Sequence, residues 1–188
     1  MKLSNRILSM GLGAALFSLP ACSAGMAGAM GGSMDAFSDA NVAASASSSN
    51  MDEIQTSQLA VQRAQNPQVR QFAEMMVSQH GQFESEMNAM LQAKGMAPMD
   101  NAWSGTLKRH LPPTLQMLQS MQGAQFDLAY MVHQVGAHEM TLHALDTTLI
   151  PNTRDPEMAA MLRDRVRPAV ADHHQRAMQI VAMLRAGS

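Results

Sequence analysis

Three histidines and one glutamate fall at similar heights along four amphipathic stretches of the sequence. Glu53, His80, His138 and His173 lie close to the midpoints of stretches centred near residues 52, 80, 137 and 171. In an antiparallel bundle of helices of equal length, residues at the helix midpoints share one layer. Three imidazoles and a carboxylate that converge in one layer would suit a divalent transition metal such as zinc, iron or copper. The spacing therefore predicts a metal site at mid-bundle.

Two other interpretations of this layer stay open. A histidine on an apolar helix face is commonly a core residue whose nitrogens bond a helix carbonyl, a carboxylate or a buried water. The layer would then be a hydrogen-bonded cluster in a purely structural or stress-related module that has no ligand. Alternatively, the four side chains do not converge. Glu139 and Asp172 flank the layer and are candidate hydrogen-bond acceptors behind the histidines.

The residue patterns argue against an enzyme. A di-iron carboxylate site in a helical bundle needs Glu-x-x-His on two helices, because that spacing brings ligands from successive turns to one centre. The chain contains no Glu-x-x-His, no Gly-x-Ser-x-Gly and no glycine-rich phosphate loop after a strand. Asp127 and His138 are eleven residues apart, about 16 Å along a helix, so they cannot form a dyad. We therefore expect no catalytic residues.

Methionine is unusually common, with 20 in 188 residues. Thioether and imidazole ligands together suit Cu(I), so a copper buffer built from methionine and histidine is an alternative function. Methionines at helical spacing are more often core residues. Met76, Met87 and Met90 share an apolar stripe with His80, which favours core packing for these three side chains.

The elements that must position these residues are helical. Val, Ile and Thr together number 20 and the aromatic residues number 7, which argues against a large sheet. Ala, Met, Gln and Leu are abundant and lose little rotamer freedom in a helix. Periodicity, caps, prolines and glycines predict four helices, over residues 41–65, 67–94, 124–149 and 156–185.

The remaining segment and one proline complete the predicted architecture. Residues 96–123 contain Pro98, Pro112 and Pro113, and they predict a loop with short helical pieces. Pro168 falls inside the last helix and should kink it or leave a free carbonyl near Asp164. Together, these features predict an all-α, up-down four-helix bundle over residues 38–188.

The N-terminal sequence is typical of an export signal. Lys2 and Arg6 precede a short apolar stretch, residues 7–19, which fits the hydrophobic region of a signal peptide spanning residues 1–21. Residues 19–22 read Leu-Pro-Ala-Cys and resemble the lipobox of bacterial lipoproteins. That resemblance implies a lipid on Cys22, and Ser23 after it implies anchoring to the outer membrane. Conventional signal-peptidase cleavage nearby is the alternative.

The composition excludes several kinds of site and partner for the exported chain. Cys22 is the only cysteine, which excludes an internal disulfide framework and a cysteine-based metal site. Residues 22–37 are rich in Gly, Ala, Ser and Met and predict a flexible tether. A net charge of −2 with 15% charged residues leaves no basic surface for nucleic acid. We expect a periplasmic protein whose partner is the membrane through its anchor; the sequence does not identify a protein partner.

Several stretches, in order and at consistent spacing, also carry a resemblance to a known family. They are residues 38–41, 53–54 with 59–64, 66–77 ending at His80, 123–130 with 138–139, and 168–173. Over residues 38–185 the chain resembles the domain of unknown function 4142 family, which consists of exported bacterial proteins. The resemblance implies a ferritin-like helical bundle and export, and it implies no activity.

The chain departs from this family's pattern at two positions. Gln79 stands where the family commonly has an acidic residue, and Arg167 stands where the family favours leucine before Pro168. The first departure removes a carboxylate that could ligate a metal or partner His80. The sequence thus favours an exported, non-enzymatic envelope protein with a binding role. It would bind either a metal at the layer of Glu53 and the three histidines or a partner through an exposed helix face.

Overall fold

Every regular element between residues 37 and 187, the part of the chain that the computed structural model describes, is helical. This confirms the all-α prediction. The predicted signal peptide and the tether up to residue 36 lie outside the described residues. No helix within the described part is both long and apolar enough to cross a membrane. The elements are α1 (Asp39–Arg63), α2 (Pro67–Ala93), α3 (Ala102–Gln119), α4 (Gly123–Ala144), η1 (Leu145–Leu149), α5 (Ile150–Asn152), α6 (Pro156–Met161), η2 (Leu162–Val166) and α7 (Arg167–Ala186).

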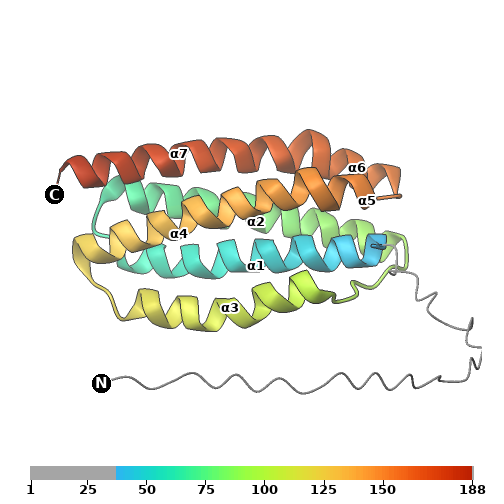
Figure 1. The fold of residues 1–188 in the computed structure, drawn as a ribbon, viewed down its shortest axis with the longest axis horizontal. Coiled ribbons are helices and arrows are strands. Elements are labelled where there is room, and N and C mark those ends of the chain that lie inside the picture. The colour runs from blue at the N-terminus through green and yellow to red at the C-terminus, as the bar shows by residue number, and fades with distance from the viewer. Residues whose placement is uncertain (1–36, 188) are drawn as a thin grey trace, which may run out of the picture. The chain divides into compact units, whose positions relative to one another are not determined.

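The long helices lie side by side and successive ones run in opposite directions (Figure 1). Helix α1 packs along α2, α4 packs along α7, and α3 packs against α1. Two apolar clusters fill the interior, and both draw side chains from α1, α2, α4 with η1, and the segment from α6 to α7. Helix α3 adds one buried apolar side chain to them, that of Leu118. The core is thus built by four helical segments, with α3 on the outside of α1.

The prediction of a loop over residues 96–123 is wrong, because residues 102–119 form the helix α3. Asn101 caps this helix by accepting hydrogen bonds from the backbone N–H groups of Trp103 and Ser104. Pro112 and Pro113 lie on its exposed side. The carbonyls that lack a donor because of these prolines belong to exposed residues, where water can satisfy them. Whether a proline breaks a helix therefore depended on which face it occupies.

Two π-helical turns carry the chain past prolines. Pro168 follows the π turn η2, in which the N–H of Arg167 bonds the carbonyl of Leu162, five residues back. The π turn η1 likewise precedes Pro151. Because a proline has no N–H, the carbonyl four residues earlier loses its donor, and a wider turn lets the helix continue. The distortion expected near Asp164 thus takes the form of a π turn.

Asp127 ties the turn between α1 and α2 to the start of α4. Its side chain is 2% exposed, and its two carboxylate oxygens accept the backbone N–H groups of Gln65 and Asn66 at 3.1 and 2.7 Å. Hydrogen bonds to a charged group contribute about 1.5–3 kcal/mol each. We expect Asp127→Ala to lower the free energy of unfolding by about 2–4 kcal/mol, measured by urea denaturation.

Asp127→Asn is the matched control, because the amide keeps one acceptor oxygen in the same place. It should also lose stability, by an amount up to that of the alanine variant, because its NH2 group faces one of the two backbone N–H donors and cannot accept from it. An Asp127→Ala protein with the urea midpoint of the wild type would show that these two bonds contribute nothing to the fold.

Candidate metal centre

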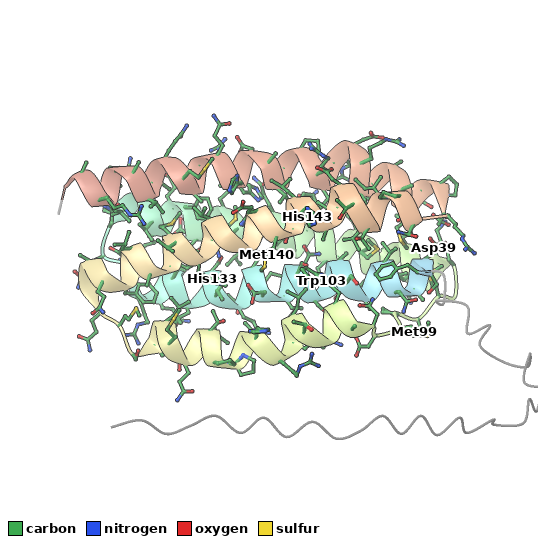
Figure 2. All side chains as sticks on the ribbon, viewed as in Figure 1. Asp39, Met99, Trp103, His133, Met140 and His143 are labelled. Carbon is green, nitrogen blue, oxygen red and sulfur yellow. The ribbon has the colours of Figure 1, made fainter. Side chains whose placement is uncertain are left out.

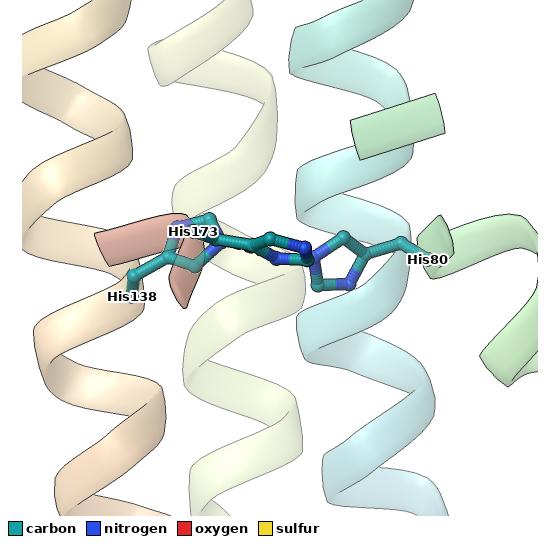
Figure 3. A group of neighbouring side chains, drawn as sticks. All are labelled: His80, His138 and His173. Atoms are coloured by element: carbon teal, nitrogen blue, oxygen red, sulfur yellow. Dashed lines mark hydrogen bonds between the residues drawn. The ribbon is translucent and has the colours of Figure 1, made fainter. Parts of the chain in front are cut away.

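Three histidines from three helices meet between the two apolar clusters. His80 comes from α2, His138 from α4 and His173 from α7, and the three side chains are 3%, 1% and 0% exposed. One ring nitrogen of each lies within 4.8 Å of those of the other two. Figure 3 shows the three imidazole rings pointing toward one another from their separate helices. The structure therefore brings together three of the four residues predicted to share a layer.

In each ring, the nitrogen that points away from the other two rings forms a hydrogen bond with an oxygen acceptor. His80 Nδ1 lies 3.0 Å from Asn50 Oδ1, His138 Nδ1 lies 2.9 Å from the carbonyl of Gln134, and His173 Nε2 lies 2.8 Å from Gln79 Oε1. An amide or carbonyl oxygen can only accept, so each of these ring nitrogens must carry the hydrogen. In a neutral imidazole the other nitrogen then has a free lone pair.

A hydrogen-bond network on α1 and α2 fixes the amide next to His80. Asn50 Nδ2 donates to Glu84 Oε2 at 3.1 Å, which turns Asn50 Oδ1 toward the His80 ring. Ser47 Oγ holds the other Glu84 oxygen at 2.6 Å. An amide aligned by a carboxylate in this way sets both the tautomer and the orientation of the ring it accepts from.

The three lone pairs that remain face one another. His138 Nε2 and His173 Nδ1 are 3.3 Å apart, within hydrogen-bond distance, and both keep a lone pair when the outward-facing nitrogens carry the hydrogens. His80 Nε2 is buried and has no hydrogen-bond partner among the described residues. Nitrogens bound to one tetrahedral ion with bonds of 2.0–2.1 Å lie about 3.4 Å apart, close to the separation of the first pair. Converging unpartnered lone pairs are a ready ligand set for a cation and are unfavourable without one.

Burial keeps the three rings neutral. It lowers the pKa of His80 well below its ordinary value of 6.5, and the nearby His138 and His173 lower it further. Burial lowers the pKa of His138 to about 4 and that of His173 to about 3. The rings are therefore unprotonated at neutral pH, which is the form that binds metal.

Glu53 lies beside the cluster and behind one of its rings. Its Oε1 is 3.4 Å from His138 Nδ1, the nitrogen that donates to Gln134, so Glu53 is on the side opposite the converging lone pairs. The side chain is 3% exposed, and its Oε2 has no hydrogen-bond partner among residues 37–187. Burial and the neighbouring Asp52 raise the pKa of Glu53 to about 8. Glu53 is thus placed to support a ligand, and it is not grouped with the three ring nitrogens.

The residues that hold the rings differ from the flanking acids expected from the sequence. Asp172 pairs with Arg176 on the exposed side of α7, and Glu139 is exposed on α4. Gln79 forms a hydrogen bond with the His173 ring, although the sequence suggested His80 as the residue it would affect. No local pattern marked Asn50 or Gln79 as partners, because their bonds cross between helices; only the i−4 spacing of Gln134 and His138 carried a signal.

The space next to the histidines is small. A cavity of about 20 Å³ is lined by Glu53, His80 and His138 on its polar side, and by apolar residues of α2, η1 and η2 on the other. This volume is enough for about one water molecule. The cluster can therefore hold an ion with a water beside it, and it has no room for a larger substrate.

Among the described residues, the methionines form no group at one surface point, and two of them, Met87 and Met161, line the small cavity beside His80 and His138. Met76 and Met131 belong to one apolar cluster, while Met87, Met158 and Met161 belong to the other. These five side chains pack the core. The exposed methionines are spread over four helices and a loop: Met51, Met99, Met117, Met140, Met178 and Met183. Their placement gives the copper-buffer alternative no common thioether site.

Comparison with known proteins gives one match. Residues 24–180 match a family model described as a domain of unknown function, DUF4142. No curated protein and no solved structure gives a significant match.

Proposed function

We propose that this chain, which belongs to the domain of unknown function 4142 family because the family model covers residues 24–180, is an exported metal-binding protein, on the geometry of its buried histidines. The proposed site consists of His80, His138 and His173, and its ligand is a single zinc, iron or copper ion. Three neutral imidazoles suit each of these metals. Structural and catalytic zinc sites alike use four-coordinate geometry, so a water would complete the set.

One observation carries this proposal. Each ring has one nitrogen at hydrogen-bond distance from an oxygen, and the three other nitrogens converge within 4.8 Å, with two of them 3.3 Å apart and His80 Nε2 unpartnered among the described residues. A structural histidine cluster would be expected to pair these nitrogens with donors, because unpaired buried polar atoms cost about 1–3 kcal/mol each. Metal-binding histidines characteristically donate their other ring nitrogen in this way.

The proposed role is non-enzymatic. The three histidines are buried, and the cavity beside them accommodates about one water molecule. An enzyme would need a substrate to reach the ion, whereas a storage or structural metal site needs only the ion.

We further propose that α1, α2, α4 and the segment from α6 to α7 form the ferritin-like four-helix bundle, with α3 added outside, because these segments build both apolar clusters.

Export and anchoring at Cys22 are also proposed, on the basis of the sequence. Lys2, Arg6 and the apolar residues 7–19 support a signal peptide, and the position of the sole cysteine after Leu-Pro-Ala supports lipidation, with residence in the periplasm at the outer membrane. Intact mass of the mature protein tests this. A mass that includes Cys22 with a diacylglycerol supports the anchor, whereas cleavage elsewhere excludes it.

Metal analysis of the purified mature protein tests the binding site. We expect about one equivalent of metal per chain after extensive dialysis against zinc, copper or iron. Titration with Co²⁺ should give the visible absorption of a tetrahedral site with nitrogen ligands. Failure to retain any of these metals would leave the histidines as a purely structural cluster.

A further inference from the structure

A cleft of about 510 Å³ opens between α1, α3 and α4. Figure 2 labels three side chains of its lining, those of Trp103, His133 and Met140, where α4 lies beside α1 and α3. His133 Nε2 bonds Asp52 Oδ2 at 3.0 Å within the cleft. Most of the lining belongs to helix surfaces that would otherwise face solvent, so the cleft brings solvent close to the bundle interior.

The inner wall of the cleft is shared with the cavity at the histidines. Ser49, Glu53 and Thr141 line both spaces. One layer of side chains therefore separates the cleft from the cluster. Glu53 is the acidic member of this wall, it is 3% exposed, and its Oε2 lacks a hydrogen-bond partner in the described part of the chain. The oxygens of an acidic side chain at this point can serve as ligands for a passing cation.

The charge of the cleft suits a cation. Its lining contains the carboxylates of Asp52, Glu53 and Glu139, and among the described residues it contains no lysine or arginine. Two histidines, His110 and His133, complete its titratable groups, and His133 is paired with Asp52. A concave surface lined by one sign of charge raises the local concentration of the opposite ion.

Other grooves near the cluster are less suitable. The groove between α2 and α7 contains Arg176 and no carboxylate among its described lining residues, and it shares none of them with the cavity. The groove between α2 and α6 borders the cavity through Met161. Its carboxylates Glu86 and Asp164 are each paired with an arginine, and its third, Glu157, is paired with Lys94.

We infer that a divalent metal ion reaches His80, His138 and His173 through the cleft between α1, α3 and α4. Glu53 is the last residue that the ion contacts before the three histidines. This inference rests on the proposed metal binding. The ion is drawn to the carboxylates of the cleft, passes the wall formed by Ser49, Glu53 and Thr141, and is then held by the three converging nitrogens.

Gly136 allows this path to be closed without touching the site. It lies on the exposed face of α4 in the cleft, and a Cβ placed on it would meet no atom within 4 Å. Gly136→Phe should narrow the cleft with an aromatic ring while helix α4 is retained. We expect Co²⁺ loading and chelator-driven release, both followed by stopped-flow absorption, to slow by at least about tenfold, with an unchanged dissociation constant.

Two controls separate blockage from other effects. Gly136→Ala makes the same backbone change without filling the cleft, and both rates should equal those of the wild type. Gln179→Phe places the same ring in the opposite groove, between α2 and α7, and should also leave the rates unchanged. Wild-type rates in Gly136→Phe, or slowing in Gln179→Phe instead, would overturn the path. A wild-type protein that binds no Co²⁺ at equilibrium would overturn the proposed function itself.

Discussion

Saturating zinc should raise the melting temperature of the protein by about 5–10 °C. An ion at a hundred times its dissociation constant stabilises the folded state by about 2.7 kcal/mol, and a domain of this size gains about 2–4 °C per kcal/mol. The His173→Ala variant should lose nearly all of this rise. Removing a ligand should weaken binding at least as much as removing a residue behind it, by about a hundredfold. The same zinc concentration would then contribute only about 0.4 kcal/mol, or about 1 °C.

His143→Ala is the matched control for this experiment. His143 is exposed near the end of α4 and lies outside the cluster, so its removal should leave the zinc-induced rise intact. Differential scanning fluorimetry measures both variants against the wild type. The metal site is contradicted if His173→Ala keeps the full rise, or if His143→Ala loses it.

Without metal, the protein should lose stability as the pH falls from 6.5 to 4.5. His138 and His173 have pKa values of about 4 and about 3 in the folded state, below the ordinary 6.5. Within this window the unfolded chain binds a proton at each histidine and the folded chain does not. Unfolding therefore takes up protons, and each histidine lowers the free energy of unfolding by about 1.4 kcal/mol per pH unit of acidification. His80 acts in the same direction.

Glu53 has the opposite effect on stability, and its contribution per pH unit is that of a single titrating group. Its pKa is raised to about 8 from 4.5, so between these values the folded state holds a proton that the unfolded state has lost. Its contribution to stability therefore grows as the pH falls from 8 to 4.5. The stabilisation from Glu53 offsets the destabilisation from one of the two histidines, His138 and His173. The net loss in the free energy of unfolding is about 1.4 kcal/mol per pH unit, or about 3 kcal/mol between pH 6.5 and 4.5, and His80 adds to this loss.

Urea denaturation of the metal-free protein at pH 6.5, 5.5 and 4.5 measures this slope. A double variant, His138→Gln with His173→Gln, removes two titrating groups and keeps side chains that can form hydrogen bonds. We expect its slope to be much flatter or inverted, because Glu53 then opposes His80 alone. A wild-type protein equally stable at pH 6.5 and 4.5 would mean that the buried histidines do not differ in protonation between the two states.

Local sequence patterns determined most of the helices and the inward faces that carry the histidines. Caps such as Asn66 before Pro67 marked helix starts, and stripes with three- and four-residue spacing placed His80 and His173 in the interior. The midpoint argument then predicted that His80, His138 and His173 share a layer, and the structure brings them together. The same reasoning missed α3, because Pro112 and Pro113 were read as breakers without knowledge of the face they occupy.

The sequence by itself therefore determined the fold class and the residue types of the layer, because both depend on helical periodicity, which is local. Only the tertiary structure decided what those residues can do. The His173 ring is set by Gln79, 94 positions away, and the His80 ring is set by Asn50 on another helix. Which nitrogen keeps its lone pair, and whether Glu53 stands among the ligands or behind one, depend on how the helices are rotated against one another. The spacing of side chains along a single helix does not determine that rotation.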